Sequence, residues 1–337
     1  MDAMGGDNGA TAVVEGIYRA SKSNEKLFFL IHGDKKILSQ EIDKRPTLKL
    51  ITKIVPTTKI VAMNEKPSSA LRNAQDTSMS SALISVKKGE ANIALSCGNT
   101  GALMAMSMVN LRKVPGVNRP AIAVLWPSRN IQGFNIVLDA GADIKADPTD
   151  LLQYALMGTA YAEAGFGLRT PRIGLLNVGT EIHKGRNELR EASELIKKAE
   201  NSGKFNYIGF VEGIDLPSNA VDVVVTDGFT GNVALKTGEG TASLINDFLK
   251  EAFNKSFFSK LGGVLAQTAL RNLKKRIDPR HVNGGVFLGL NGTVVKSHGG
   301  ADAIAVAAAI NLSFQLENSG FSKTLASKFR ILVDNDL

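Results

Sequence analysis

Residues 95 to 103, with the sequence LSCGNTGAL, combine glycines and neutral hydrogen-bond donors where a strand pattern changes to a helix pattern. The change falls at Gly98-Asn99-Thr100-Gly101. The first amides of a helix have no partner within the helix and lie at the positive end of its dipole. Paired glycines let an anion approach these amides, and Asn99 and Thr100 would add side-chain donors. The segment is a candidate anion site or simply a tight strand-to-helix connection.

Several other glycine-containing loops carry candidate site residues, which are polar side chains and the glycines beside them. Most of these loops follow apolar, strand-like segments. The candidate residues are Asp2, Gly5, Gly6, Asp139, Lys184, Asp227, Thr230, Gly231, Asn232 and His298. In open α/β sheets the loops at the carboxyl ends of the strands line the ligand crevice. We therefore expect the polar members of this set to converge with Asn99 at one edge of a sheet.

The elements that would position these loops alternate between strand and helix patterns. Strands are predicted at 26–33, 48–55, 121–126, 135–138, 172–178, 221–226 and 292–296, and helices at 11–21, 35–44, 70–88, 149–164, 187–202 and 303–316. Several strands are apolar throughout, which indicates a mostly parallel sheet covered by helices on both faces. No low-complexity linker divides the chain, so residues 1–337 are predicted to form a single α/β domain.

Residues 241–278 depart from the alternation and predict a helical hairpin within the domain. Apolar residues recur at helical spacing on both sides of Gly262-Gly263, where we expect the break. Basic residues flank an unusually apolar turn that contains Phe257, Phe258, Leu261, Val264 and Leu265. Two interpretations stay open. The hairpin packs on the body or at a dimer interface, or it rests on anionic lipid as a basic amphipathic element.

Composition restricts the class of protein and its partners. The 337 residues carry a formal net charge of +8, which favours an acidic partner. With only four Tyr and one Trp, and no interleaving of aromatic and basic residues, nucleic acid is not expected. A single cysteine suits a reducing cytoplasm, and the apolar runs are too short to span a bilayer. The histidines lack metal-ligand spacing, so no metal site is predicted.

Seven motifs occur in a fixed order along the chain. They are DAMGGD, PSSALRNAQDTSM, SCGNTGAL, LDAGAD, NVGTEIHKG, TDGFTGNVALK and KSHGGAD. With them the chain resembles the PlsX family of phosphate acyltransferases over nearly its whole length. The resemblance implies a three-layer α/β/α sandwich like isopropylmalate dehydrogenase and phosphotransacetylase, usually a homodimer. It also implies transfer of a fatty acyl group from acyl-[acyl carrier protein] to inorganic phosphate, giving acyl phosphate for phospholipid synthesis.

This reaction gives the candidate residues roles. Phosphate must be bound and aimed at the thioester carbonyl, whose oxygen gains negative charge in the transition state. Thioesters are already activated, so no metal, cofactor or covalent intermediate is needed. Lys184 would hold phosphate or stabilise the oxyanion, with Thr230 and Asn232 as neutral donors to the same oxygens. Asp227 would orient Lys184 or act as a base, and His298 would shuttle a proton or bind phosphate.

Each of these residues has a structural alternative. Lys184 could be an ordinary exposed lysine, Thr230 and Asn232 could cap a helix, and Asp227 could only form a turn. A structural hydrogen bond would equally explain His298. The amides of residues 98–101 could hold inorganic phosphate or the pantetheine arm of the carrier protein.

Departures from the family pattern bear on two further features. Cys97 replaces the alanine that is usual in the family, so it is not expected to be an acyl-carrying nucleophile. Similar proteins have a full strand before DAMGGD, whereas only Met1 precedes it here, and whether that strand is absent is left open.

Other functions compete with the leading one. Acyl transfer between coenzyme A and phosphate, as in phosphotransacetylases, uses the same chemistry. A dehydrogenase is disfavoured because no strand-borne GxGxxG with a downstream acidic residue is present. A non-catalytic protein that binds lipid or nucleic acid would rest on net charge alone. We expect a cytoplasmic enzyme with peripheral contact to an anionic membrane.

Overall fold

A mixed β-sheet forms the centre of the computed structural model, which describes residues 1–24, 26–277 and 284–334. Eight strands lie in the order β3-β10-β9-β4-β5-β8-β6-β7. They are β3 (Ile93–Ser96), β4 (Ala121–Pro127), β5 (Phe134–Leu138), β6 (Arg172–Leu176), β7 (Asn206–Val211), β8 (Val223–Val225), β9 (Gly285–Leu288) and β10 (Thr293–Lys296). A parallel pair, β1 (Phe29–Gly33) and β2 (Thr52–Pro56), continues this sheet, because Asp2 bridges to both His32 and Ser96.

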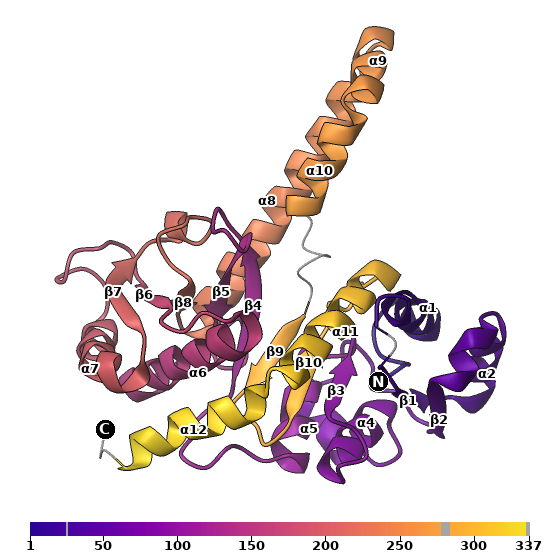
Figure 1. Ribbon diagram of the computed structural model, residues 1–337, viewed down its shortest axis with the longest axis horizontal. Coiled ribbons are helices and arrows are strands. Elements are labelled where there is room, and N and C mark those ends of the chain that lie inside the picture. The colour runs from indigo at the N-terminus through magenta and orange to yellow at the C-terminus, as the bar shows by residue number, and fades with distance from the viewer. Residues whose placement is uncertain (25, 278–283, 335–337) are drawn as a thin grey trace.

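Helices cover both faces of the sheet, as Figure 1 shows. One face carries α1 (Gly9–Ser21), α2 (Lys35–Asp43), α6 (Pro148–Phe166), α7 (Asn187–Gly203), α11 (Ala303–Asn318) and α12 (Phe321–Asp334). The other carries α3 (Pro67–Arg72), α4 (Ser78–Lys87), α5 (Thr100–Asn110) and the start of α8 (Gly228–Asn254). Neighbouring strand residues alternate between the two cores: Leu95 belongs to the first and Ala94 to the second. The predicted three-layer α/β fold is confirmed.

Strand direction divides the sheet into two halves. Most neighbouring strands pair in parallel, but β9 is antiparallel to both β10 and β4, and β4 is antiparallel to β5. Strands β3, β10 and β4 therefore run one way, and β9, β5, β8, β6 and β7 run the other way. As a result, the carboxyl ends of β3 and β10 lie at one edge of the sheet, whereas those of β5, β6 and β8 lie at the opposite edge.

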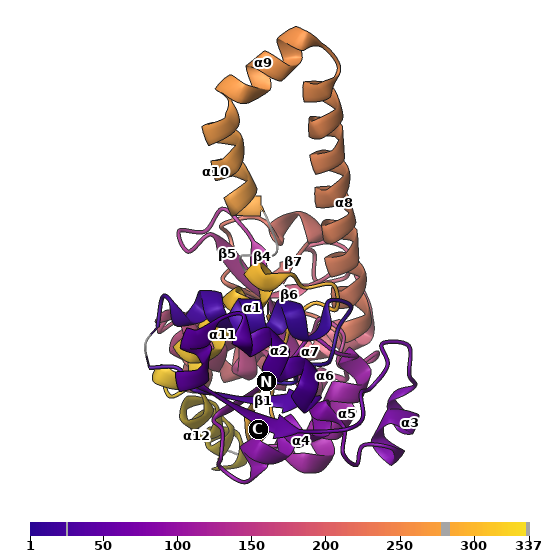
Figure 2. The ribbon, with the colours of Figure 1, turned by 90° about the vertical axis from the view of Figure 1, so that its right-hand side faces the viewer.

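A helical hairpin protrudes from the body, as predicted (Figures 1 and 2). Helix α8 rises from the end of β8, α9 (Phe257–Leu265) crosses at the tip, and α10 (Gln267–Ile277) returns. The predicted break at Gly262-Gly263 is wrong, since α9 runs through both glycines. The chain turns instead at Ser256, whose side chain accepts a hydrogen bond from the Ser259 amide and caps α9.

Other element boundaries differ from the sequence prediction for local reasons. The helix predicted over 70–88 is two helices, α3 and α4, because Thr77 caps the second one by accepting from the Ser80 amide. Strands β7 and β9 and helix α12 were not predicted. Short 3-10 helices, Pro46–Leu50 and Gly213–Asp215, occupy two connections. Within the described ranges, every helix is too short or too polar to cross a membrane.

Candidate functional site

The structure separates the predicted site residues into two groups at opposite edges of the sheet. The β3–β10 group contains Asp2, Gly5, Gly6, Gly98, Asn99, Thr100, Gly101 and His298. The β6–β8 group contains Asp139, Lys184, Asp227, Thr230, Gly231 and Asn232. The expectation that all of them meet at one edge is therefore wrong, because β5, β6 and β8 run opposite to β3 and β10.

In the β3–β10 group, three loops pack closely against one another. A Cβ atom on Gly5 would lie only 2.8 Å from the Gly98 backbone nitrogen, so this contact needs a glycine. The Asp7 amide donates to the Gly299 carbonyl oxygen at 2.8 Å, which joins the first loop to the KSHGGAD loop. The buried Asp2 carboxylate accepts from Ser96 Oγ at 2.6 Å and from the Gly5 amide at 3.2 Å. Asp2 thus shapes the loops, and its negative charge does not favour phosphate.

The amino terminus of α5 presents backbone donors rather than the predicted Asn99 amide. Asn99 caps the helix, because its Oδ1 accepts from the Ala102 amide at 3.0 Å. Its Nδ2 donates to the carbonyl oxygens of Met63 at 2.8 Å and Glu65 at 2.9 Å. The Asn99 side chain is therefore occupied by backbone partners. Thr100 and Gly101, the first residues of α5, are exposed, and the first amides of a helix have no partner within the helix.

His298 lies exposed in the same group of loops. Its Nδ1 accepts a hydrogen bond from the Gly300 amide at 3.2 Å. In the neutral ring the proton then resides on Nε2. An imidazole in this tautomer can donate a hydrogen bond to a substrate oxygen.

Cys97 is buried beneath these loops. Burial raises the pKa of its thiol above the ordinary value. The group is therefore a protonated thiol at neutral pH, which is a poor nucleophile.

Lys296 is a member of the β3–β10 group that the sequence prediction missed. It ends β10, and its Nζ donates to the carbonyl oxygens of Cys97, at 3.3 Å, and of Ser297. Burial lowers the pKa of its ammonium to about 8, and the charge of Lys236 on α8 acts in the same direction. The segment TVVK resembles the end of an apolar strand, so the only signal in the sequence is that Lys296 is also the first residue of the KSHGGAD motif.

In the β6–β8 group, the charged side chains neutralise one another. Asp227 caps α8 through the Thr230 amide at 2.8 Å, and its Oδ2 pairs with Arg186 at 2.5 Å. Lys184, which is 45% exposed, pairs with Glu181 at 2.8 Å, and this contact raises the pKa of the lysine. Asp227 therefore does not orient Lys184 as predicted. Arg186, at the start of α7, is the cation beside Asp227 that sequence analysis missed.

Asp139 and the first turn of α8 complete this second group. The Asp139 carboxylate accepts from several loop amides, including those of Gly141 at 3.1 Å and Asp143 at 2.8 Å. Its carbonyl oxygen lies so close to Gly231 that any Cβ there would collide with it. Asn232 is exposed and faces Gly141. The loop after β5 thus packs on the start of α8.

Helix α8 runs from the β6–β8 group toward the β3–β10 group. It begins at Gly228 in the β6–β8 group, and Leu235 packs against the core that contains α4 and α5. One residue further along, the Lys236 ammonium is close enough to lower the pKa of Lys296.

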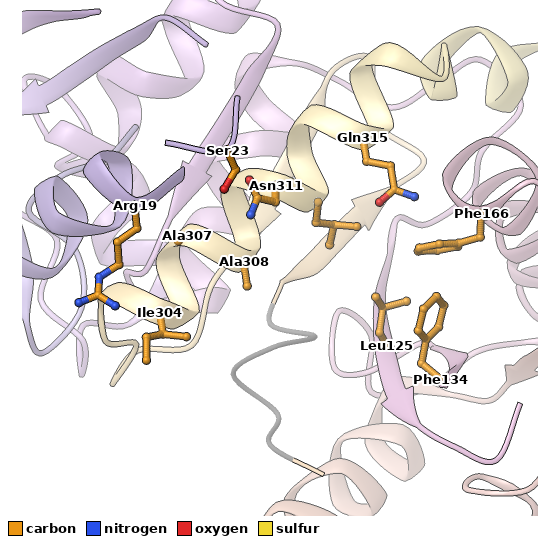
Figure 3. A pocket seen from close by; sticks show the side chains of 11 residues that line it. Arg19, Ser23, Leu125, Phe134, Phe166, Ile304, Ala307, Ala308, Asn311 and Gln315 are labelled. Atoms are coloured by element: carbon orange, nitrogen blue, oxygen red, sulfur yellow. The ribbon is translucent and has the colours of Figure 1, made fainter. Parts of the chain in front are cut away.

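A groove of about 520 Å³ lies on the face of the sheet that carries α6 and α11, between α11 and the β4–β5 strands (Figure 3). Residues of α11 form one wall, and Leu125, Phe134 and Phe166 face them. The Phe134 and Phe166 rings meet edge to face at 4.6 Å. None of the residues predicted for the site lines this groove. Across the described ranges, no cluster of three His, Cys, Asp or Glu side chains is arranged to hold a metal ion.

Comparison with known proteins assigns the family. Residues 1–324 match the family model described as "Fatty acid synthesis protein". A phosphate acyltransferase from Jannaschia sp. (strain CCS1) is 61% identical over 328 residues, which cover 97% of this chain and 90% of the relative. One from Dinoroseobacter shibae is 62% identical over 97% of this chain and 85% of the relative. The chain belongs to this phosphate acyltransferase family. It is accordingly an acyltransferase enzyme of lipid synthesis.

Solved structures with the same fold include two phosphotransacetylases and a related transacylase. A phosphotransacetylase from Streptococcus pyogenes superposes with a TM-score of 0.59 at 17% identity, covering 91% of each chain. A branched-chain phosphotransacylase from Enterococcus faecalis V583 gives a TM-score of 0.59 at 15% identity, covering 93% of this chain and 96% of the other. EutD phosphotransacetylase from Staphylococcus aureus gives 0.55 at 14% identity, covering 94% and 91%. At these identities the likeness concerns the fold alone.

Proposed function

We propose that this phosphate acyltransferase moves a fatty acyl group from acyl-[acyl carrier protein] to inorganic phosphate and releases acyl phosphate. The observation that carries the proposal is the identity of about 60% to phosphate acyltransferases over 97% of the chain. The formal charge of +8 supports an acidic protein as the acyl donor, since opposite charges accelerate encounter.

The reaction needs no covalent enzyme intermediate. An oxygen of the phosphate dianion attacks the thioester carbonyl carbon, the new C–O bond forms, and the C–S bond breaks. The proton of HPO₄²⁻ passes to the departing sulfur, which leaves as the thiol of the carrier protein. We assign His298, whose Nδ1 accepts from the Gly300 amide, the role of donating to the phosphate or relaying that proton.

We place the phosphate at the β3–β10 group. Supporting this choice are the first amides of α5, which lack partners within the helix, the exposed His298 and the buried cation of Lys296. The assignment of Lys184, Thr230 and Asn232 as phosphate or oxyanion ligands, made from sequence, remains the competing proposal. The ion pairs of Lys184 and Arg186 count against it, because both cations are already neutralised.

We further propose that the hairpin rests on the surface of an anionic membrane and that the enzyme is a homodimer in the cytoplasm. Phe257, Phe258, Leu261, Val264 and Leu265 are all exposed on α9. An exposed apolar patch of this kind marks an interaction site. The alternative is that the same patch is a dimer interface.

A defined assay tests the reaction. Purified enzyme is mixed with acyl-[acyl carrier protein], and the free carrier-protein thiol is measured with and without inorganic phosphate. We expect thiol release that depends on phosphate and yields one acyl phosphate per thiol. Turnover with acyl-coenzyme A but not with the carrier protein would instead assign the phosphotransacetylase reaction.

A further inference from the structure

Lys296 is a buried cation with no ion-pair partner among the described residues. Its side chain lies at the end of β10, and the residue is only 8% exposed. Among the described residues, no carboxylate lies within ion-pair distance of its Nζ. Burying an ammonium costs free energy unless an opposite charge or hydrogen bonds compensate for lost water. A buried ammonium without such a partner is therefore a candidate binding group for an anionic ligand.

A second buried lysine shows how this chain compensates a purely structural cation. Lys328 on α12 is 5% exposed, and its Nζ donates to the Gly203 carbonyl oxygen at 3.0 Å. Unlike Lys296, it also pairs with the Glu163 carboxylate at 3.2 Å. The two lysines are thus similarly buried and both donate to backbone carbonyls, but of the two only Lys328 has a carboxylate partner among the described residues.

The hydrogen bonds of Lys296 leave one donor for a ligand. An ammonium has three N–H groups. Within the described part of the chain, its acceptors are two carbonyl oxygens, those of Cys97 and Ser297. Cys97 and Ser297 immediately precede Gly98 and His298, so the ammonium lies where the Gly98 loop and the His298 loop begin.

The surroundings of Lys296 contain a further positive charge. Burial lowers the pKa of Lys296 most, Cys97 and Asp2 raise it, and Lys236 on α8 is near enough to lower it by a smaller amount. The first amides of α5 add the positive end of a helix dipole above Cys97. An anion held here would be attracted to the Lys296 ammonium, and to that of Lys236, which also pairs with Glu239 at 2.7 Å.

We propose that Lys296 is a catalytic residue that binds the phosphate substrate, its third N–H donating to a phosphate oxygen between the Gly98 and His298 loops. This inference rests on the proposed function. The same hydrogen bonds to the Cys97 and Ser297 carbonyls fix the ammonium in place before phosphate arrives, so little conformational freedom is lost on binding.

Calorimetric titration of the full-length enzyme with inorganic phosphate tests the proposal without requiring turnover. Lys296→Met removes the charge and the donors, whereas Lys296→Gln keeps a donor for the carbonyls but has no charge. Lys328→Met is the matched control. We expect both Lys296 variants to bind phosphate about 10- to 100-fold more weakly, the range for losing a charge-assisted hydrogen bond. Lys328→Met should bind it like the unaltered enzyme.

Kinetics give a second measurement. In variants that still turn over, the KM for phosphate should rise while the KM for the acyl donor stays within about twofold. Melting temperatures show whether each variant is folded. Unchanged phosphate affinity in folded Lys296→Gln, or an equal loss in Lys328→Met, overturns the proposal. Phosphate binding that depends on Lys296 in a protein that does not consume acyl-[acyl carrier protein] would overturn the proposed function and leave this inference standing.

Discussion

Lys184, in a glycine-containing loop, and Lys296, at the end of β10, lie at opposite edges of the sheet and differ in what compensates their charge. Lys184 is half exposed and pairs with Glu181, a contact within one loop that the sequence motif does not reveal. Lys296 is buried and depends on two carbonyl groups. The sequence predicts a catalytic role for Lys184 because this lysine lies among polar residues of the NVGTEIHKG motif. The sequence does not single out Lys296, because a lysine that ends an apolar strand resembles an ordinary strand terminus.

Lys184→Ala tests which group binds phosphate. If the β3–β10 group does, kcat/KM for phosphate should fall less than about tenfold, because an exposed ion pair contributes little. The matched control is Lys250→Ala, which removes a lysine from another exposed pair three residues apart, with Asp247. Initial rates at varied phosphate concentration are the measurement. A loss of orders of magnitude in Lys184→Ala alone would place phosphate at the β6–β8 group and contradict our proposal.

Among the elements, the sequence predicts the alternation of strands and helices but not the direction of each strand. Apolar periodicity records burial, and burial is the same for parallel and antiparallel neighbours. The reversal depends on β4–β5 and on the unpredicted β9, which pairs with both β10 and β4. Without β9, the sequence predicts that the loops share one edge. The site could therefore be predicted as a set of loops but not as two separate groups.

The hairpin offers a prediction about membrane contact. Phe258→Asp combined with Leu261→Asp puts two charges on the exposed apolar face of α9, where they oppose burial in lipid. We expect this variant to lose sedimentation with phosphatidylglycerol vesicles and to keep its rate in solution. Ile131→Asp with Ile144→Asp, two exposed residues on the body, is the control and should still bind the vesicles.

The outcome for oligomeric state separates the two interpretations of this element. Light scattering should give the same mass for the α9 variant and the unaltered enzyme. If the variant becomes monomeric while the control does not, α9 is an interface between copies of the chain. Vesicle binding that survives both charges would also contradict the membrane proposal.

At the scale of the whole molecule, the first residues join the β1–β2 pair to the larger sheet. Asp2 bridges β1 to β3, and the Ala3 amide donates to the His32 carbonyl oxygen at 3.0 Å. The His32 side chain is 1% exposed, and its Nδ1 lies 2.8 Å from Ser81 Oγ on α4. Burial lowers the pKa of His32 to about 3. A neutral histidine is therefore built into the junction between the β1–β2 pair and the larger sheet.

This histidine should make the stability of the whole molecule sensitive to mild acid. The unfolded chain takes up a proton at His32 near pH 6.5, whereas the folded chain does so only near pH 3. The free energy of unfolding therefore falls as pH falls below about 6.5, by about 1.4 kcal/mol per pH unit from this group. Buried Asp139 and Asp150, whose pKa values burial raises, act in the opposite sense. Their contribution is the same in a His32 variant and cancels in the difference.

Urea unfolding at pH 7, 6 and 5 measures the effect. Between pH 6.5 and 5 the unaltered enzyme should lose about 2 kcal/mol more stability than His32→Gln, which cannot titrate. The glutamine variant will be less stable at pH 7 if it loses the Ser81 contact, but that offset does not change with pH. His183→Gln, at an exposed position, should follow the unaltered enzyme. Parallel stability curves for the unaltered enzyme and His32→Gln would show that acid acts through other groups.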